Sequence, residues 1–274
     1  MLRHLATVTL GVCTVSAGIY ECKARESQTV DNHHRQRKQQ ADPPHHHNSS
    51  STHTDNIAGE KSKMDYRQES ERVANKVYEL YKDTDGIISC EKFAKEIKVM
   101  YKKSPEFEGH IYRAECTLEG SPDRIVDFVL PSPKGLRGKW DKNVKESEVL
   151  EDVDENLIVA RSATHSAAMG LISSRDFVDL IMIKRYDDGI VTTNSKSIQR
   201  KDCPPKDGFV RGTNYHGGTI CIPIKGEQNK TKVINLVQTD LGGMLPTSLV
   251  ESALPSNLVD FFVDLDKALK SEID

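Results

Sequence analysis

The sequence predicts an α+β domain in which a curved antiparallel sheet packs against one long C-terminal helix. Short apolar or alternating segments follow one another through the middle of the chain. They are joined by turns such as 187–189 and 225–227, without the strand–helix–strand rhythm of a parallel sheet. An amphipathic stretch then runs from Pro246 or Thr247 to about Lys270. Its apolar side chains recur at steps of three or four, as Val250, Leu254, Leu258, Phe261, Leu265 and Leu269.

The elements before the sheet are each predicted from a local signal. Residues 71–82 form an amphipathic helix, because their apolar side chains fall at helical spacing. A strand follows at 111–118, where alternate residues from Tyr112 to Leu118 are apolar and share one face. Ser121 then caps a short helix, and Pro122 occupies its first position.

The remaining strands are predicted from short apolar runs between turns. They lie at 148–153, 157–164, 177–186, 190–198, 209–214, 219–224 and 232–239. The strand beginning at Phe177 is unusual because Leu180 to Ile183 is apolar on both faces, whereas a strand with one wet face alternates. Either protein covers both faces of this strand, or one face lines a cavity that the terminal helix closes.

Composition divides the chain into three parts. Residues 1–26 hold an uncharged run behind Arg3, the layout of a signal peptide, although a mitochondrial leader fits about as well. Residues 27–63 contain few aliphatic side chains and include the histidine run 45–47, so we expect a disordered low-complexity tail. Residues 64–274 are the expected folded domain. Met64 is also a candidate translation start, in which case the functional form lacks the leader.

Several classes of function are disfavoured. With 38 basic and 41 acidic residues the net charge is −3, so no electrostatic grip on nucleic acid is expected. The six cysteines are widely spaced and lack the pairing of a zinc site, and no metal or cofactor is predicted. No nucleophile elbow, phosphate loop or metalloprotease motif occurs, so no catalytic residue is assigned and the chain is not expected to be an enzyme.

Four ordered blocks carry a resemblance to a known family. They are GLRGKWDKNV at 135–144, SAAMGLISSRDFVDL at 166–180, CPPKDGFVRG at 203–212 and TDLGGMLP at 239–246. Together they resemble the START domain, the steroidogenic-acute-regulatory-related lipid-transfer family, and most closely its small soluble subgroup that binds cholesterol, oxysterols and bile acids. The similarity spans roughly residues 64–270.

This resemblance implies a helix-grip fold, in which the sheet wraps around the C-terminal helix and an internal hydrophobic tunnel holds one lipid. The mobile entrance loop would be 167–174, where Ile172 joins Met169 and Leu171 in touching ligand or membrane, and the gating helix would be 247–270. The ligand-binding residues it implies are Ser162, Thr164, Met169, Leu171, Ile181, Ile183, Asn214, Leu254, Leu258 and Phe261.

The polar positions depart from the family's founding member. That relative carries a buried acid and a buried arginine across its tunnel, and the matching positions here are Ser162 and Ile181. Polar recognition would therefore come from Ser162, Thr164 and Asn214, which leaves room for more hydroxylated or acidic sterols. Arg175 and Asp176 match a family pair that holds the loop to the sheet or contacts ligand. Trp140 is expected to anchor the core.

We therefore expect a monomeric cytoplasmic carrier that binds a sterol or bile acid, meets membranes transiently and exchanges its ligand between them. A working leader would instead make it secretory or mitochondrial. The alternatives are a lipid-sensing interaction module and, as a weaker one, an enzyme of the same fold class acting on a hydrophobic substrate.

Overall fold

The computed structural model describes residues 52–89, 96–130 and 134–271. The expected targeting segment 1–26, and the expected tail as far as residue 51, lie outside these residues. The helices are α1 (Thr52–Lys82), α2 (Pro122–Val129), α3 (Arg137–Trp140), the 3-10 turn η1 (Ala168–Gly170) and α4 (Thr247–Lys270). The strands are β1 (Ile88–Ser89), β2 (Lys98–Lys103), β3 (His110–Glu119), β4 (Val144–Asp154), β5 (Leu157–Thr164), β6 (Arg175–Arg185), β7 (Val191–Ser197), β8 (Val210–Arg211), β9 (Thr213–Asn214), β10 (Gly217–Pro223), β11 (Lys230–Val237) and β12 (Thr239–Asp240).

The first helix is longer than predicted. It begins at Thr52 rather than near Glu71, so residues 52–63 are helical where we expected a disordered tail. That expectation was based on too few apolar residues to bury a core. A helix that continues outward from a packed end needs no core of its own, because elongation adds one backbone hydrogen bond for each residue that it orders.

The predicted antiparallel sheet is confirmed. Its strands are ordered β1-β2-β3-β11-β10-β7-β6-β5-β4, and β8 pairs in parallel with β6, off this path. The predicted strand 209–214 is divided, because β8 joins β6 whereas β9 joins β12 in a separate pair. The division falls at Gly212, where a Cβ atom would come within 2.3 Å of the Phe177 ring. Strands β1, β2 and β12 were not predicted from the sequence.

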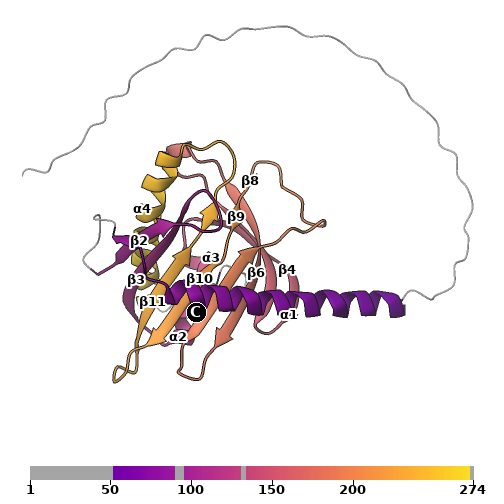
Figure 1. Ribbon diagram of the computed structural model, residues 1–274, viewed down its shortest axis with the longest axis horizontal. Helices are drawn as coiled ribbons and strands as arrows, with labels where there is room; N and C mark the ends of the chain where they lie inside the picture. Colours follow the sequence, from indigo (N-terminus) through magenta and orange to yellow (C-terminus); the bar gives the residue numbers. More distant parts are fainter. Residues whose placement is uncertain (1–51, 90–95, 131–133, 272–274) are drawn as a thin grey trace, which may run out of the picture. The chain divides into compact units, whose positions relative to one another are not determined.

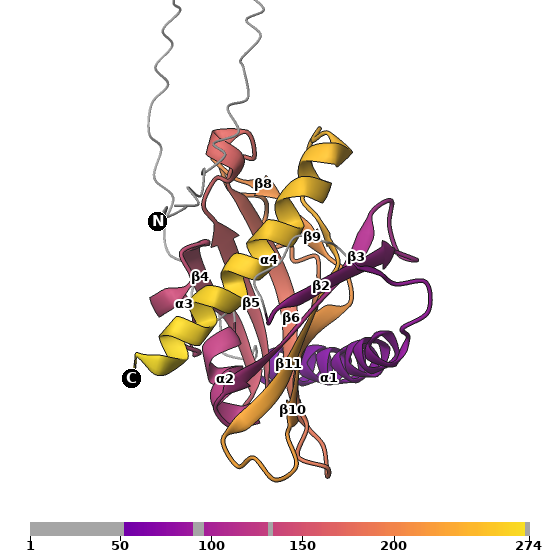
Figure 2. The same cartoon turned by 90° about the vertical axis from the view of Figure 1, so that its left-hand side faces the viewer.

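Helices cover both faces of the sheet (Figures 1 and 2). Helices α2 and α4 pack on the face that carries Tyr112, Ala114 and Cys116 of β3, and these side chains form one core cluster with residues of both helices. On the opposite face α1 packs its Val73 and Val77 with Ile111 of the same strand. The alternation of β3 therefore places Tyr112, Ala114 and Cys116 in one core and Ile111 in the other, and the predicted alternation is confirmed.

The long terminal helix has two unlike halves. All its buried side chains lie from Leu258 onward, namely Leu258, Phe261, Phe262, Leu265, Ala268 and Leu269. The residues before Leu258 are exposed or half-buried, and Pro255 interrupts the helical hydrogen bonding between the two parts. The C-terminal half is thus fixed to the sheet, and the N-terminal half is held by fewer buried groups.

Candidate functional site

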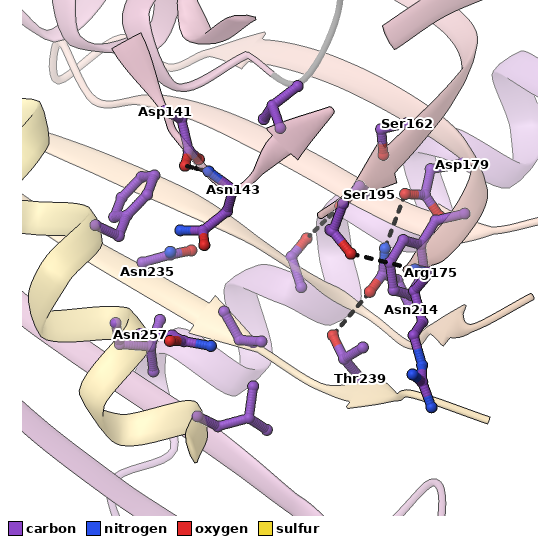
Figure 3. A pocket seen from close by; sticks show the side chains of 18 of the residues that line it. Asp141, Asn143, Ser162, Arg175, Asp179, Ser195, Asn214, Asn235, Thr239 and Asn257 are labelled. Atoms are coloured by element: carbon purple, nitrogen blue, oxygen red, sulfur yellow. Dashed lines mark hydrogen bonds between the residues drawn. The ribbon is translucent and has the colours of Figure 1, made fainter. Parts of the chain in front are cut away.

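A cavity of about 300 Å³ lies between α4 and the sheet. This volume is at the lower end of the range for pockets that hold small molecules, roughly 300–1,000 Å³. Strand β6 supplies Phe177 and Ile181 to its wall, and α4 supplies Leu254, Leu258 and Phe261. Helix α4 and the sheet therefore enclose one space, partly lined by apolar side chains (Figure 3).

Most of the predicted ligand-binding residues meet in this cavity. They are Ser162, Thr164, Ile181, Asn214, Leu254, Leu258 and Phe261, joined by Arg175. Ser162 and Thr164 lie on β5, which pairs with β6, the strand of Arg175 and Ile181, and Asn214 lies on β9, which contacts β6 and β7. The remaining three residues come from α4.

Four predicted residues lie outside the cavity lining. Met169 and Leu171 are exposed at the surface. Met169 lies in η1 with a left-handed backbone, φ 55°, and Leu171 follows this turn. Of the apolar residues in this loop, Ile172 is the one that is buried and lines the cavity. Ile183 lies beyond the cavity and packs into the core. Asp176 points to the opposite face of β6, away from the cavity.

The two-sided apolar run of β6 is explained by this arrangement. On one face Leu180 packs in a cluster with Val159, and Tyr66 of α1 contacts that cluster. On the other face Ile181 lines the cavity. One face is therefore covered by protein and the other faces the cavity, as the second interpretation of the sequence proposed.

The cavity wall is more polar than a hydrophobic tunnel, because a buried acid lies between its apolar residues. Asp179 is 4% exposed and lines the cavity between Phe177 and Ile181 of β6. Its Oδ1 accepts a hydrogen bond from the Ser197 hydroxyl at 2.7 Å, and its Oδ2 accepts one from the Asn214 amide at 2.8 Å. Burial raises the pKa of Asp179, and these two hydrogen bonds oppose the rise only in part.

The polar contacts continue past Asp179 (Figure 3). The Thr239 hydroxyl donates to Oδ1 of Asn214 at 2.7 Å, and the Asn214 backbone amide donates to the Ser197 hydroxyl at 2.8 Å. The side chains of Asp179, Ser197, Asn214 and Thr239 therefore form one connected polar cluster, to which β6, β7, β9 and β12 each contribute a residue.

Sequence reasoning missed most of this polar lining. Asp179 carried a signal, since it lies two residues from Phe177 and from Ile181 and an acid interrupts an otherwise apolar face. Three asparagine side chains that line the cavity carried no recognisable sequence signal. They are Asn143 in a loop, Asn235 on β11 and Asn257 on α4. Only the register and the packing of α4 bring them to one space.

Arg175 joins the two loops at one end of the cavity. Its Nε donates to the Leu241 carbonyl at 3.0 Å, its Nη2 to the Gly242 carbonyl at 3.3 Å, and its Nη1 to the carbonyl of Ser173. The loop before β6 and the loop before α4 are thereby held to one strand. The predicted role in holding a loop to the sheet fits these contacts, although Arg175 also lines the cavity.

Asp176 and Trp140 hold structure together. The Asp176 carboxylate is fully buried and receives hydrogen bonds from Arg161 at 2.9 Å and from Arg211 at 3.0 Å. The Trp140 indole donates to the Phe128 carbonyl at 3.0 Å, and its ring packs against Phe261 at 5.4 Å.

Of the cysteines in the part of the chain that the structure describes, Cys116 and Cys221 are buried and Cys203 is half-buried. Cys116, Cys203 and Cys221 are free thiols, and burial raises the pKa of Cys116 to about 12. Within 52–89, 96–130 and 134–271, no group of three histidine, cysteine or acidic side chains is placed to hold a metal ion. Among the helices of these same residues, none has both the length and the apolar character to cross a bilayer.

A sheet wrapped on a C-terminal helix, with a cavity between them, defines a START-type lipid-binding fold. The START domain family matches residues 91–272, and the chain belongs to this family. StAR-related lipid transfer protein 5 of Mus musculus is 42% identical over 203 residues, which cover 74% of this chain and 95% of the relative. StAR-related lipid transfer protein 6 of Homo sapiens is 33% identical over 208 residues, or 76% of this chain and 93% of the relative.

A solved structure agrees with these sequence matches. Human StAR-related lipid transfer protein 5 superposes with a TM-score of 0.72 at 40% identity, covering 76% of this chain and 98% of that chain. These relatives are lipid transfer proteins by name. The chain is accordingly a lipid-binding protein rather than an enzyme, and the cavity under α4 is its candidate lipid site.

Proposed function

We propose that this protein carries a single sterol-type lipid, namely cholesterol, an oxysterol or a bile acid, and exchanges it between membranes. The observation that supports this most directly is the composition of the cavity wall. Apolar side chains from α4 and β6 face a polar cluster built on Asp179 and Asn214. A sterol has the same division, with a large apolar body and one or a few hydroxyl groups.

Exchange of such a lipid requires no energy source. A sterol that buries on the order of 400 Å² of apolar surface gains about 10 kcal/mol at ~25 cal/mol per Å², which is close to what it had in a bilayer. Transfer is therefore nearly isoenergetic, and its rate is set by how readily the cavity opens. The loosely packed N-terminal half of α4 is the part of the cavity wall best suited to open.

Membrane contact is proposed through the two entrance loops. Met169 and Leu171 are exposed on the loop before β6, and Met244 is exposed on the loop before α4. Arg175 binds backbone carbonyls of both loops. Helix α4 itself carries Glu251, Asp260, Asp264 and Asp266 against Lys267 and Lys270, so strong attraction to anionic lipid along this helix is not expected. We propose brief contacts by a cytoplasmic monomer.

Ligand binding is tested by titrating the full chain with a fluorescent sterol. The bound probe is then displaced with cholesterol, a side-chain hydroxysterol, a bile acid and phosphatidylcholine. Saturable one-to-one binding that a steroid displaces supports the proposal and ranks the ligands. Displacement by phosphatidylcholine alone leaves a START lipid-binding protein but overturns the assignment of a sterol-type lipid.

Membrane contact is tested by sterol transfer between neutral vesicles. Leu171→Ser is expected to slow transfer while leaving the equilibrium affinity for the sterol unchanged, because Leu171 lies outside the cavity lining. Ile88→Ser is the matched control, since Ile88 is also an exposed apolar residue but lies on β1. Equal slowing by both variants would contradict a specific role for the entrance loop.

A further inference from the structure

Asp179 is a buried acid without an ion-pair partner. None of the ion pairs among the described residues includes it, and its hydrogen-bond donors Ser197 and Asn214 are both neutral. The neighbouring buried acid, Asp176, is instead paired with two guanidinium groups. Burying an unpaired carboxyl costs free energy, so its position in the cavity wall calls for a role that an apolar residue would not fill.

The arginine side chains near Asp179 form their hydrogen bonds with other groups. Arg211 is the charged group whose field acts on this carboxyl, and its guanidinium pairs with Asp176. Arg175 lines the same cavity, and its guanidinium donates to the carbonyls of Ser173, Leu241 and Gly242. His165 also lines the cavity but makes no ion pair with Asp179. The charge of Asp179 is therefore not neutralised by a neighbouring protein cation.

The neighbours of Asp179 already have partners. The Ser197 hydroxyl donates to Asp179 and accepts from the Asn214 backbone amide. The Asn214 side chain donates to Asp179 and accepts from Thr239. Each carboxylate oxygen accepts one of these hydrogen bonds and has capacity for a second. The cluster thus holds the carboxylate in a fixed orientation, with acceptor capacity remaining at the cavity wall.

We propose that Asp179 determines ligand specificity by accepting a hydrogen bond from a hydroxyl group of the bound lipid. This inference rests on the proposed function and narrows its ligand class. A hydroxyl group supplies the hydrogen that the carboxylate accepts. A ketone at the same carbon has only acceptor electrons and leaves the carboxylate unpaired, and a carboxylate there adds repulsion. A bile acid must therefore place its acid group away from Asp179.

The test compares alcohol and ketone pairs that share one carbon skeleton. The dissociation constants of 5α-cholestan-3β-ol and 5α-cholestan-3-one are measured at pH 7.5 by displacement of a fluorescent sterol from the full chain. Hydroxyl and ketone pairs at carbon 7 and on the side chain are compared in the same way, so that each end of the ligand is covered. For at least one pair, the wild-type protein is expected to prefer the alcohol by about tenfold or more.

Asp179→Asn is expected to reduce that preference to about twofold, because the amide can donate to a ketone as well as accept from a hydroxyl. Asp207→Asn makes the same chemical change at an exposed loop residue and should retain the wild-type preference. Thermal unfolding establishes that each variant is folded. If Asp179→Asn does not fold, the ratio of the alcohol and ketone dissociation constants of the wild-type protein is the deciding measurement. The inference is overturned if the wild-type protein prefers the alcohol in none of the pairs.

The outcomes separate this inference from the function on which it rests. If the wild-type protein binds neither member of any pair, the sterol assignment fails. If it binds alcohols and ketones equally, or if Asp179→Asn keeps the full preference, sterol binding stands and the role of Asp179 is overturned.

Discussion

Arg211 donates two hydrogen bonds to the carboxylate of Asp176, from Nε to Oδ1 at 3.0 Å and from Nη2 to Oδ2 at 3.0 Å. The pair joins β8 to β6 beside their two-residue parallel pairing. Arg161 of β5 donates to Oδ2 of the same carboxylate at 2.9 Å. A single fully buried acid therefore fastens three strands together on the face of β6 that points away from the cavity.

Removing the charge of Asp176 should destabilise the protein strongly. Asp176→Asn leaves two guanidinium groups around a neutral amide, and breaking a buried ion pair by removing one partner costs about 3 to 5 kcal/mol. Urea unfolding followed by tryptophan fluorescence measures this loss. Asp207→Asn, on an exposed loop, serves as the control and should leave the unfolding midpoint unchanged. Equal midpoints for Asp176→Asn and the wild type would contradict a stabilising role.

The two acids of β6 should respond to pH in opposite ways. Burial alone would raise the pKa of Asp176, but hydrogen bonds from Arg211 and Arg161 hold it below its usual value. Its stabilising contribution is therefore present above the unfolded pKa of about 3.9 and is lost as pH falls through the folded pKa. For Asp179 burial raises the pKa, so its contribution is present below about 3.9 and is lost as pH rises through the folded pKa.

Difference measurements isolate these two contributions. Between pH 3.5 and 7.5, the unfolding free energy of the wild type minus that of Asp176→Asn should increase with pH. The same difference taken against Asp179→Asn should decrease over this range. Slopes of the same sign would show that one of the two assignments is wrong.

Loss of the Arg175 guanidinium should loosen both entrance loops. Arg175→Lys keeps the charge but cannot reach the carbonyls of Ser173, Leu241 and Gly242 together, because an ammonium lacks the planar fork. Hydrogen exchange should become faster in 167–174 and 241–243, and the bound lipid should dissociate faster. Arg185→Lys replaces an exposed arginine and is the control. Faster exchange confined to one loop would contradict the proposed link between them.

The two halves of α4 should contribute unequally to stability. Leu265 is fully buried, and Leu265→Ala should cost about 2 to 5 kcal/mol. Leu249 is half-buried in the N-terminal half, and Leu249→Ala should cost about 1 kcal/mol or less. Urea unfolding of both variants gives the comparison. Similar losses would contradict a loosely packed N-terminal half.

Elements with strong local signals were predictable. The strand predicted at 157–164 coincides with β5, and the helix predicted after Ser121 is α2, where the Ser121 hydroxyl accepts from the Arg124 amide at 3.3 Å. The apolar stripe predicted for α4 includes Leu258, Phe261, Leu265 and Leu269, which are buried, whereas Val250 and Leu254 of the same stripe are half-buried. Strands β1 and β12 have two residues each, too few for a period to be visible, and they exist through pairing with other strands.

The candidate site was only partly predictable, because hydrogen bonds between distant residues define it. Asp179 and Asn214 are separated by 35 positions in sequence, and their contact requires that β9 lie beside β6 and β7. The exposure of Met169 depends in turn on a left-handed turn that its sequence does not encode in a recognisable way.

By itself, the sequence determined the class of this protein: the strand and helix patterns, the terminal amphipathic helix and four blocks shared with the START family. These are local or linear features, since side-chain periodicity and capping act over a few residues. Only the tertiary structure decided that Asp179 lines the cavity without an ion-pair partner, while Asp176, three residues earlier on the opposite face of β6, is paired with Arg161 and Arg211. Register, the switch of strand partners at Gly212 and the placement of α4 bring those groups together, and each depends on contacts across the whole domain.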